Sequence, residues 1–353
     1  MLRKMLVLVL LSTLSFVSFA ADLRVATWNI QRLGEGGQKS FPAMAEVIAR
    51  VDFIAIQEIM SESALAELHD AVQARTGEPW GLLKSHLIGR GSYKEMYAFL
   101  WRETAVEYVD GAVVYLDHGD RFAREPLSAR FKSTGTGEEF VAATIHVLYG
   151  RSEADRIPEI EALGDYWEWL REVYPETPTM MVMGDFNLPP SHRAWASVKA
   201  SARPLVTRGA STLSSVNGKF ANLYDNVWLG NGSSMGVTSA AVLAYPKLIG
   251  WTHAQARQFV SDHAPVVATL STNPGAASEQ LTVQAQPTTA PFQIAAKHPD
   301  HSGEAMIRGN RNSMIFHRAD CPSYGDVSPR NRVEFATAQD AEEAGYRLAG
   351  NCP

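Results

Sequence analysis

The sequence is poor in cysteine and in positive charge. Its 353 residues include two cysteines, and both lie near the C-terminus. The larger part of the chain must therefore be held by its hydrophobic core and by any ions that it binds. The formal net charge of −6 argues against a protein that binds nucleic acid by overall charge alone. It does not exclude a phosphodiester substrate, because a bound divalent metal can supply positive charge locally.

Long apolar runs are also scarce. One lies at the N-terminus, where two basic residues precede an apolar run over positions 5–19 and small residues follow. This pattern predicts a secretory signal peptide over residues 1–20, cleaved after Ala20. The alternative, an uncleaved membrane anchor, is disfavoured because the run is short for a spanning helix. We therefore expect an exported protein, periplasmic or extracellular, with no membrane anchor after cleavage.

Apolar periodicity divides residues 21–271 into many strands and few helices. The expected helices cover 41–51, 62–75 and 153–172. The expected strands cover 23–30, 53–59, 96–101, 112–116, 126–132, 139–148, 179–186, 223–229 and 264–270. This mixture indicates an α/β or α+β domain, and two packed sheets covered by helices would fit it.

The composition changes at the end of this domain. Residues 272–304 are rich in Ser, Thr, Gln, Ala and Pro, which predicts a flexible linker. Residues 305–353 then carry a strand-like stretch at 314–317 and a helix at 338–344. So short a segment buries little apolar surface, so we expect a small α+β module held by a disulfide or a metal.

Polar side chains stand where the apolar strands end. One such residue would mean little, because strands often end in polar caps. Several strands that end in acids, amides and histidines indicate a common rim on which a site is assembled. The residues are Asn29, Glu58, His146, Asp185, Asn187, Asp225, Asp262 and His263.

The residue types on this rim suit one chemistry. Oxygen-bearing side chains are the ligands that Mg²⁺ or Mn²⁺ prefers over zinc. Those side chains belong to Asn29, Glu58, Asp185, Asn187 and Asp262. Two histidines with acidic neighbours suit proton transfer and stabilisation of a pentacovalent phosphorus. A metal and a histidine together are what hydrolysis of a phosphodiester requires.

Six segments carry a resemblance to a known family. TWNIQRLG, DFIAIQEI, HVLYG, GDFN, YDNVWL and SDHAPV occur in this order over residues 23–270. They resemble the successive motifs of the endonuclease/exonuclease/phosphatase superfamily. GRGSYKEMYAFLWR (89–102) and FAREPLSARF (122–131) are similar to the deoxyribonuclease I branch. The resemblance implies a four-layer sandwich of two packed mixed β-sheets flanked by helices.

The resemblance also assigns catalytic roles. It implies that His146 pairs with Glu95, and that His263 pairs with Asp225. Each carboxylate would orient its imidazole and stabilise the charged form. One histidine would act as general base on water, and the other as general acid or phosphate stabiliser. Which histidine does which stays open.

The remaining roles concern metal and DNA. Glu58, with Asn29 and Asp262 nearby, would hold Mg²⁺ or Mn²⁺, and a structural Ca²⁺ is left open. Asp185 and Asn187 would orient the phosphate or a histidine, or bind a second metal.

Two further residues would contact DNA. Tyr93 would pack against a sugar in the minor groove, and Arg124 would contact a phosphate without reading sequence. One position departs from the branch: Met60 stands where the resemblance expects an arginine that enters the minor groove. That contact is therefore weakened or supplied elsewhere.

The function implied is a monomeric, secreted, metal-dependent endodeoxyribonuclease that acts on double-stranded DNA with little sequence specificity. One alternative is another phosphodiesterase of the superfamily, such as a secreted sphingomyelinase. Another is a nucleic-acid or surface-binding protein on an inactive nuclease scaffold. The complete set of rim residues argues against the last, because no structural need accounts for all of them.

The C-terminal segment resembles the metal-binding domain of the Ada DNA-repair protein, which holds zinc with four cysteines. Here Cys321 and Cys352 remain, so we expect a disulfide between them and do not expect zinc. Five arginines against two acids between positions 308 and 332 would suit DNA binding or simply a solvated face.

Overall fold

The computed structural model describes most of the expected nuclease domain and parts of the C-terminal module. The described residues are 22–35, 39–215, 218–272, 307–311, 313–318, 321, 323–324, 327–328, 331–335, 338–343, 346–350 and 352. The expected signal peptide and all but the first residue of the expected linker lie outside them. The chain divides into two compact units, residues 1–283 and 284–353.

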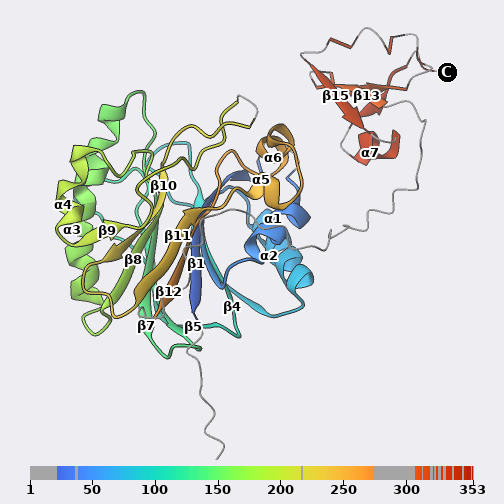
Figure 1. Ribbon diagram of the computed structural model, residues 1–353. Helices are drawn as coiled ribbons and strands as arrows, with labels where there is room; N and C mark the ends of the chain where they lie inside the picture. The colour runs from blue at the N-terminus through green and yellow to red at the C-terminus, as the bar shows by residue number, and fades with distance from the viewer. Residues whose placement is uncertain are drawn as a thin grey trace, which may run out of the picture. The chain divides into compact units, whose positions relative to one another are not determined.

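Twelve strands of the first unit form two six-stranded sheets (Figure 1). The first sheet contains β1 (Leu23–Leu33), β2 (Phe53–Ile59), β3 (Trp80–Lys84), β4 (Met96–Arg102), β11 (Gly236–Val242) and β12 (Val266–Ser271). Their order is β11-β12-β1-β2-β4-β3. The second contains β5 (Val106–Val114), β6 (Leu127–Ser133), β7 (Glu139–His146), β8 (Thr179–Asp185), β9 (Ala202–Pro204) and β10 (Asp225–Gly230). Their order is β5-β6-β7-β8-β10-β9.

The two sheets pack face to face on an apolar core. Phe53 of β2 lies 4.8 Å from Phe131 of β6 between ring centroids and 5.4 Å from Phe140 of β7. All three rings are fully buried. Edge-to-face contacts of this kind add to the stabilisation from apolar burial. The central strands are buried on both faces, which explains their nearly continuous apolar sequences.

Helices cover the outer faces of both sheets, as Figure 1 shows. The first sheet is covered by α1 (Phe41–Ile48), α2 (Glu62–Thr76), α5 (Tyr245–Leu248) and α6 (His253–Phe259). The second is covered by α3 (Ile157–Val173) and α4 (Ala196–Lys199). The expected four-layer arrangement of two mixed sheets flanked by helices is confirmed.

Helix α2 shows how the local sequence sets an element's bounds. The Ser61 hydroxyl accepts a hydrogen bond from the Ala64 amide and so caps the first turn. Gly77 ends the helix with a φ of 68°, a conformation that glycine adopts without steric cost. Leu65, Leu68 and Val72 lie on one face and are buried.

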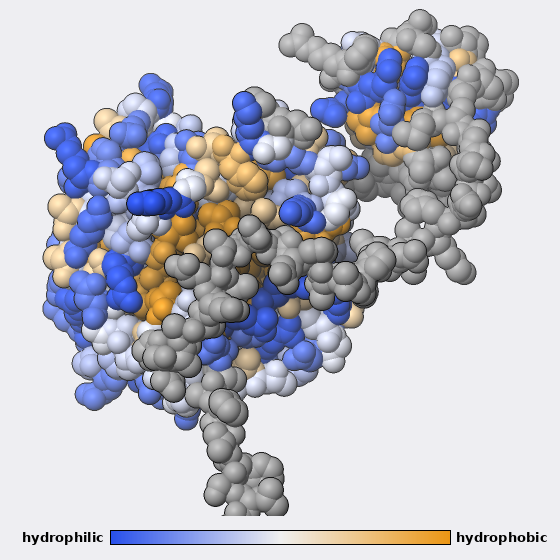
Figure 2. Space-filling model, viewed as in Figure 1, coloured by the Kyte–Doolittle hydropathy of each residue, from blue (hydrophilic) through white to orange (hydrophobic). Residues whose placement is uncertain are grey.

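The strands that the periodicity missed lie mainly at sheet edges. β5 begins at Val106 and not near residue 112, because most of its residues are exposed and show no apolar alternation. β11 is made largely of small residues, and every one is partly exposed. In Figure 2 most of the unit's surface in view is hydrophilic, while apolar residues gather over the region of β11. Among the described residues, no helix has the length and apolar character needed to span a bilayer.

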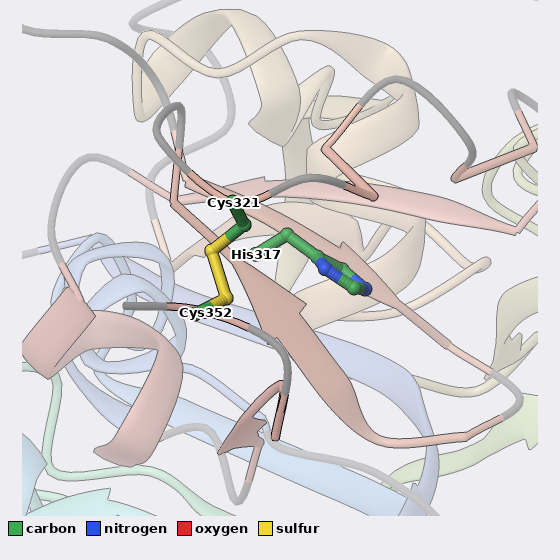
Figure 3. A group of neighbouring side chains, drawn as sticks. All are labelled: His317, Cys321 and Cys352. Atoms are coloured by element: carbon green, nitrogen blue, oxygen red, sulfur yellow. A yellow bond between two sulfur atoms is a disulfide. The ribbon is translucent and has the colours of Figure 1, made fainter.

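The second unit has a small sheet of its own. Its elements are β13 (Ile307–Asn310), β14 (Ile315–His317), β15 (Arg332–Phe335), α7 (Ala338–Glu343) and β16 (Arg347–Leu348), with strand order β15-β13-β14-β16. A disulfide joins Cys321 to Cys352, and His317 lies beside it (Figure 3). Closing a loop with a sequence separation of 31 lowers the entropy of the unfolded chain and so stabilises the fold by about 4 kcal/mol. Because each sulfur is bonded to the other, neither is the thiolate that zinc requires.

Candidate active site

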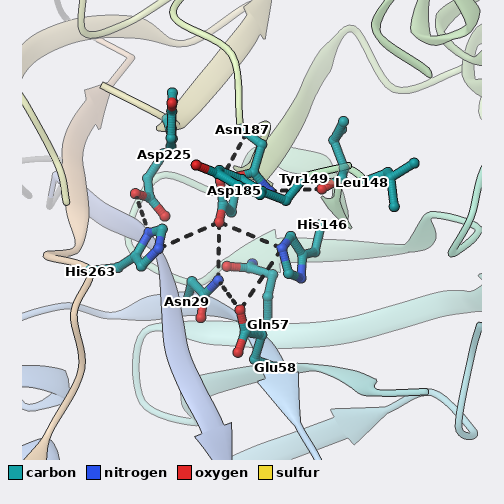
Figure 4. Close-up of polar contacts among 12 residues, drawn as sticks. Asn29, Gln57, Glu58, His146, Leu148, Tyr149, Asp185, Asn187, Asp225 and His263 are labelled. Carbon is teal, nitrogen blue, oxygen red and sulfur yellow. Dashed lines mark hydrogen bonds and ion pairs between the residues drawn. The ribbon is translucent and has the colours of Figure 1, made fainter. Parts of the chain in front are cut away.

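Strand pairing brings three of the rim residues side by side. His146 ends β7 and Asp185 ends β8, and these two residues are register partners in a parallel pair. Asp225 begins β10 and is the antiparallel partner of Asp185. Parallel strands end at the same edge of a sheet, so the rim predicted from the sequence follows from the topology (Figure 4).

Asn29 links the two sheets across this edge. Its side-chain nitrogen donates hydrogen bonds to Glu58 (2.8 Å) and to Asp185 (3.0 Å). Its side-chain oxygen accepts one from the Gln31 amide at 2.9 Å. The amide of Asn29 is fully buried, so these bonds fix the position of Glu58 on the first sheet relative to Asp185 on the second.

The His146 imidazole is held by a buried carboxylate. Its Nδ1 lies 3.0 Å from both carboxylate oxygens of Glu95. The Tyr93 hydroxyl donates to Glu95 at 2.8 Å, and the Arg124 Nε lies 3.7 Å from it. Burial alone would raise the pKa of Glu95, but protonated His146, with Arg124 and the Tyr93 hydroxyl, outweighs this effect and lowers the pKa. Burial would lower the pKa of His146, and Glu95 raises it above its ordinary value.

The His263 imidazole is held in the same way from the opposite side. Its Nδ1 lies 2.8 Å from Asp225 Oδ2. Burial opposes protonation of His263, but Asp225 and then Asp185 raise its pKa to about 10. The other oxygen of Asp225 is buried without a hydrogen-bond partner among the described residues.

Both histidines turn their second nitrogen toward Asp185 (Figure 4). The Nε2 atoms of His146 and His263 each lie 3.7 Å from Asp185 Oδ2. Burial would raise the pKa of Asp185, but the charges of His263 and His146 lower it. Each histidine therefore has one nitrogen fixed by a carboxylate and one directed into the site.

The backbone is strained where it forms this edge. Gln31, Arg32, Glu58 and Asn187 have φ values of 49°, 52°, 61° and 51°. Non-glycine residues in this region cost about 1–3 kcal/mol each and collect at functional sites. The Arg32 amide donates to Glu58 at 3.0 Å, and the Asn187 amide to Asp185 at 2.9 Å, which supports the unusual conformation.

An open cleft of about 640 Å³ runs over the edge. Every rim residue except the buried Asn29 and Asp225 lines it, together with Tyr93 and Arg124. Arg124, which the resemblance expects to contact a phosphate, has a buried guanidinium that donates to the His146 carbonyl at 3.1 and 2.8 Å. This arginine orients His146 before any substrate is present.

The donor atoms at the cleft fit a hard cation. Glu58 and Asp262 offer carboxylates that are partly open to solvent, with side chains 15% and 27% exposed. Asn187 uses its amide nitrogen to donate to the Val147 carbonyl. Both polar atoms of Asn29 already have protein partners, which favours a role in orienting Glu58. Asp185, Asp225 and His263 also lie close enough to hold an ion, but His263 Nδ1 is already bonded to Asp225.

Sequence reasoning missed several residues that hold the site together. Arg156 is buried, donates to the Asn187 carbonyl at 2.6 Å and stacks on Tyr149 at 4.2 Å. Glu159 accepts from the amides of Ala123 (3.0 Å) and Leu148 (3.2 Å), and so ties the loop of Arg124 to the loop after His146. Arg156 and Glu159 lie in the segment that the sequence predicted as a helix over 153–172, and no motif indicated a role for either.

Residues 26–263 match the model of the endonuclease/exonuclease/phosphatase family, and this span includes the whole edge described above. The chain belongs to this family. The match covers every rim residue, and the fold agrees with it. The protein is therefore a hydrolytic nuclease or phosphodiesterase.

Two curated relatives of this family member are named deoxyribonucleases. One from Thioalkalivibrio sp. is 49% identical over 273 residues, which is 75% of this chain and 76% of the relative. Deoxyribonuclease-1 of Oryctolagus cuniculus is 27% identical over 76% of this chain and all of the relative. A solved family structure from Bacteroides thetaiotaomicron shares the fold, with a TM-score of 0.53, 16% identity, and coverage of 71% of this chain and 98% of that one.

The C-terminal segment has a separate match. Residues 286–348 match the model of the ArfC family. This match gives no support to the resemblance to the Ada metal-binding domain.

Proposed function

We propose that the protein is an exported, monomeric endonuclease that uses a divalent metal to hydrolyse double-stranded DNA with little sequence preference. The observation that carries the proposal is the pair of histidines directed at Asp185 within an open cleft. The deoxyribonuclease names of the relatives support DNA as substrate. The N-terminal sequence supports export.

The chain's own residues account for the proton transfers. A histidine Nε2 takes a proton from the attacking water, while its Nδ1 stays bonded to its carboxylate, so positive charge on the ring is stabilised. The second histidine donates to, or stabilises, an oxygen of the phosphate. Asn29 and Asp185 keep the two rings at a fixed separation, which removes much of the entropic cost of alignment.

Glu58 and Asp262 would hold the metal, with Asn187 and Asn29 beside them. A bound Mg²⁺ or Mn²⁺ polarises a phosphoryl oxygen and offsets charge on the leaving oxygen. The cleft's openness suits a substrate that lies across the surface, as a duplex must.

The proposal is tested with supercoiled plasmid and the purified mature protein. We expect nicking with Mg²⁺ or Mn²⁺, none with chelator, and a loss of about 10³-fold in rate for H146A. Arg50→Ala, a change at an exposed arginine just after α1, serves as the control and should leave the rate unchanged. Intact plasmid with Mg²⁺, Mn²⁺ and added Ca²⁺ would refute a deoxyribonuclease, and sphingomyelin and phosphoinositides would then be assayed.

A further inference from the structure

Arg32 lies at the edge of the cleft with its charged group outside the network that organises the site. Its backbone amide donates to Glu58 at 3.0 Å, so the residue is anchored beside the metal-binding carboxylate. Its side chain is 45% exposed and lines the cleft. The guanidinium carbon lies 5.5 Å from the centre of the Tyr93 ring, a distance typical of a cation–π contact.

The other arginines that line the described part of the cleft, Arg124 and Arg257, already bind groups of the protein. Arg124 is 7% exposed in its side chain and donates to the His146 carbonyl. Arg257 donates to the Leu213 carbonyl at 3.0 Å and lies 3.5 Å from Asp262. Neither guanidinium can turn fully to a substrate without abandoning a bond that shapes the site.

Arg32 is held by a weaker interaction. Its ion-pair partner is Glu35, three residues further on, and both side chains are about half exposed. Exposed pairs of this kind contribute about 0–1 kcal/mol. A phosphate is a strong, bidentate acceptor for a guanidinium. An incoming phosphate can therefore replace Glu35 at little cost.

The position of Arg32 also bears on the arginine that the resemblance expects at Met60 and that this sequence lacks. Leu33 is the register partner of Ile59, and the Met60 amide donates to the Leu33 carbonyl at 2.9 Å. Arg32 and Met60 thus lie on neighbouring strand ends. Met60, the residue after β2, carries no charge, and Arg32 of β1 supplies a cation at the cleft instead.

We infer that Arg32 binds a backbone phosphate next to the one that is cleaved, by exchanging Glu35 for the phosphate. The inference rests on the proposed function. Under it, Arg124 orients His146 while Arg32 binds the substrate, and both guanidinium groups lie near the Tyr93 ring, at 5.4 Å for Arg124 and 5.5 Å for Arg32.

The test compares R32A, E35Q and the matched control R50A in plasmid-nicking kinetics at several salt concentrations. Arg50, like Arg32, is an exposed arginine paired with a glutamate, but it lies just after α1 and does not line the cleft. We expect R32A to raise KM about tenfold with kcat nearly unchanged, and to reduce the salt slope of binding by about one. E35Q should lower KM about twofold, because it removes the competitor for Arg32.

Each outcome has a distinct meaning. Wild-type protein that nicks plasmid, with R32A unchanged in KM and salt slope, overturns the inference and leaves the proposed function intact. A fall in kcat at constant KM in R32A also overturns it, because Arg32 would then act only through Glu58. Wild-type protein that leaves plasmid intact refutes the proposed function itself. R32K keeps the positive charge but cannot bind a phosphate with two parallel hydrogen bonds, so its KM should lie between those of wild type and R32A.

Discussion

The two histidine–carboxylate pairs on either side of Asp185 are built differently. Glu95 accepts a hydrogen bond from the Tyr93 hydroxyl and has the Arg124 guanidinium nearby, so several groups stabilise its negative charge. Asp225 has His263 on one oxygen and no described partner on the other. Arg124 opposes protonation of His146, whereas the charges acting on His263 are carboxylates that favour its protonation. Similar pairs therefore need not have equal proton affinity.

The largest expected effect comes from removing the histidines together. H263A, like H146A, should lower the nicking rate by about 10³-fold. Because the two rings act on one phosphate, the double variant should lie within about tenfold of the slower single variant. Single-turnover nicking with excess protein measures this. If the rate loss of the double variant equalled the product of the two single losses, the two histidines would act independently.

A smaller effect concerns stability and pH. The folded pKa of His263, about 10, lies above its ordinary value of 6.5. Its proton therefore stabilises the fold fully below about pH 6.5, and this contribution is lost as pH rises through about 10. In chelator, the free energy of unfolding should fall from pH 7 to pH 10 by about 2 kcal/mol more in wild type than in D225N. Urea unfolding at the two pH values measures the difference, and equal falls would contradict it.

The smallest effect sharpens the contrast between the carboxylates. Y93F removes the hydroxyl that donates a hydrogen bond to Glu95. One hydrogen bond to a carboxylate contributes about 1.5–3 kcal/mol, but Arg124 remains beside Glu95 and compensates in part, so the nicking rate should fall by about three- to tenfold. Y108F, at an exposed tyrosine of β5, is the control. A rate equal to wild type would show that the hydroxyl does not support Glu95.

Much of the fold was predictable because buried strands carry apolar sequences that end in polar residues. The edge strand β11 and the first part of β5 were not predicted, since exposed strands lack that contrast. The rim residues were predicted as a set, but the hydrogen bonds among them were not. Asn29, for example, donates to Glu58 and Asp185, and only the crossing of two sheets brings those carboxylates together. The burial of Arg124 likewise depends on packing that no local pattern records.

The placement of β1 beside β12 has a consequence for the protein's synthesis. These are the first and last strands of the catalytic unit, and they pair from Leu23↔Leu270 to Thr27↔Val266. The Trp28 indole also donates to the His263 carbonyl at 2.7 Å. A ribosome makes Asn29 early and His263 more than two hundred residues later. A chain synthesised only as far as residue 262 therefore has no complete site, and the site is complete only once β12 has been made and has paired with β1.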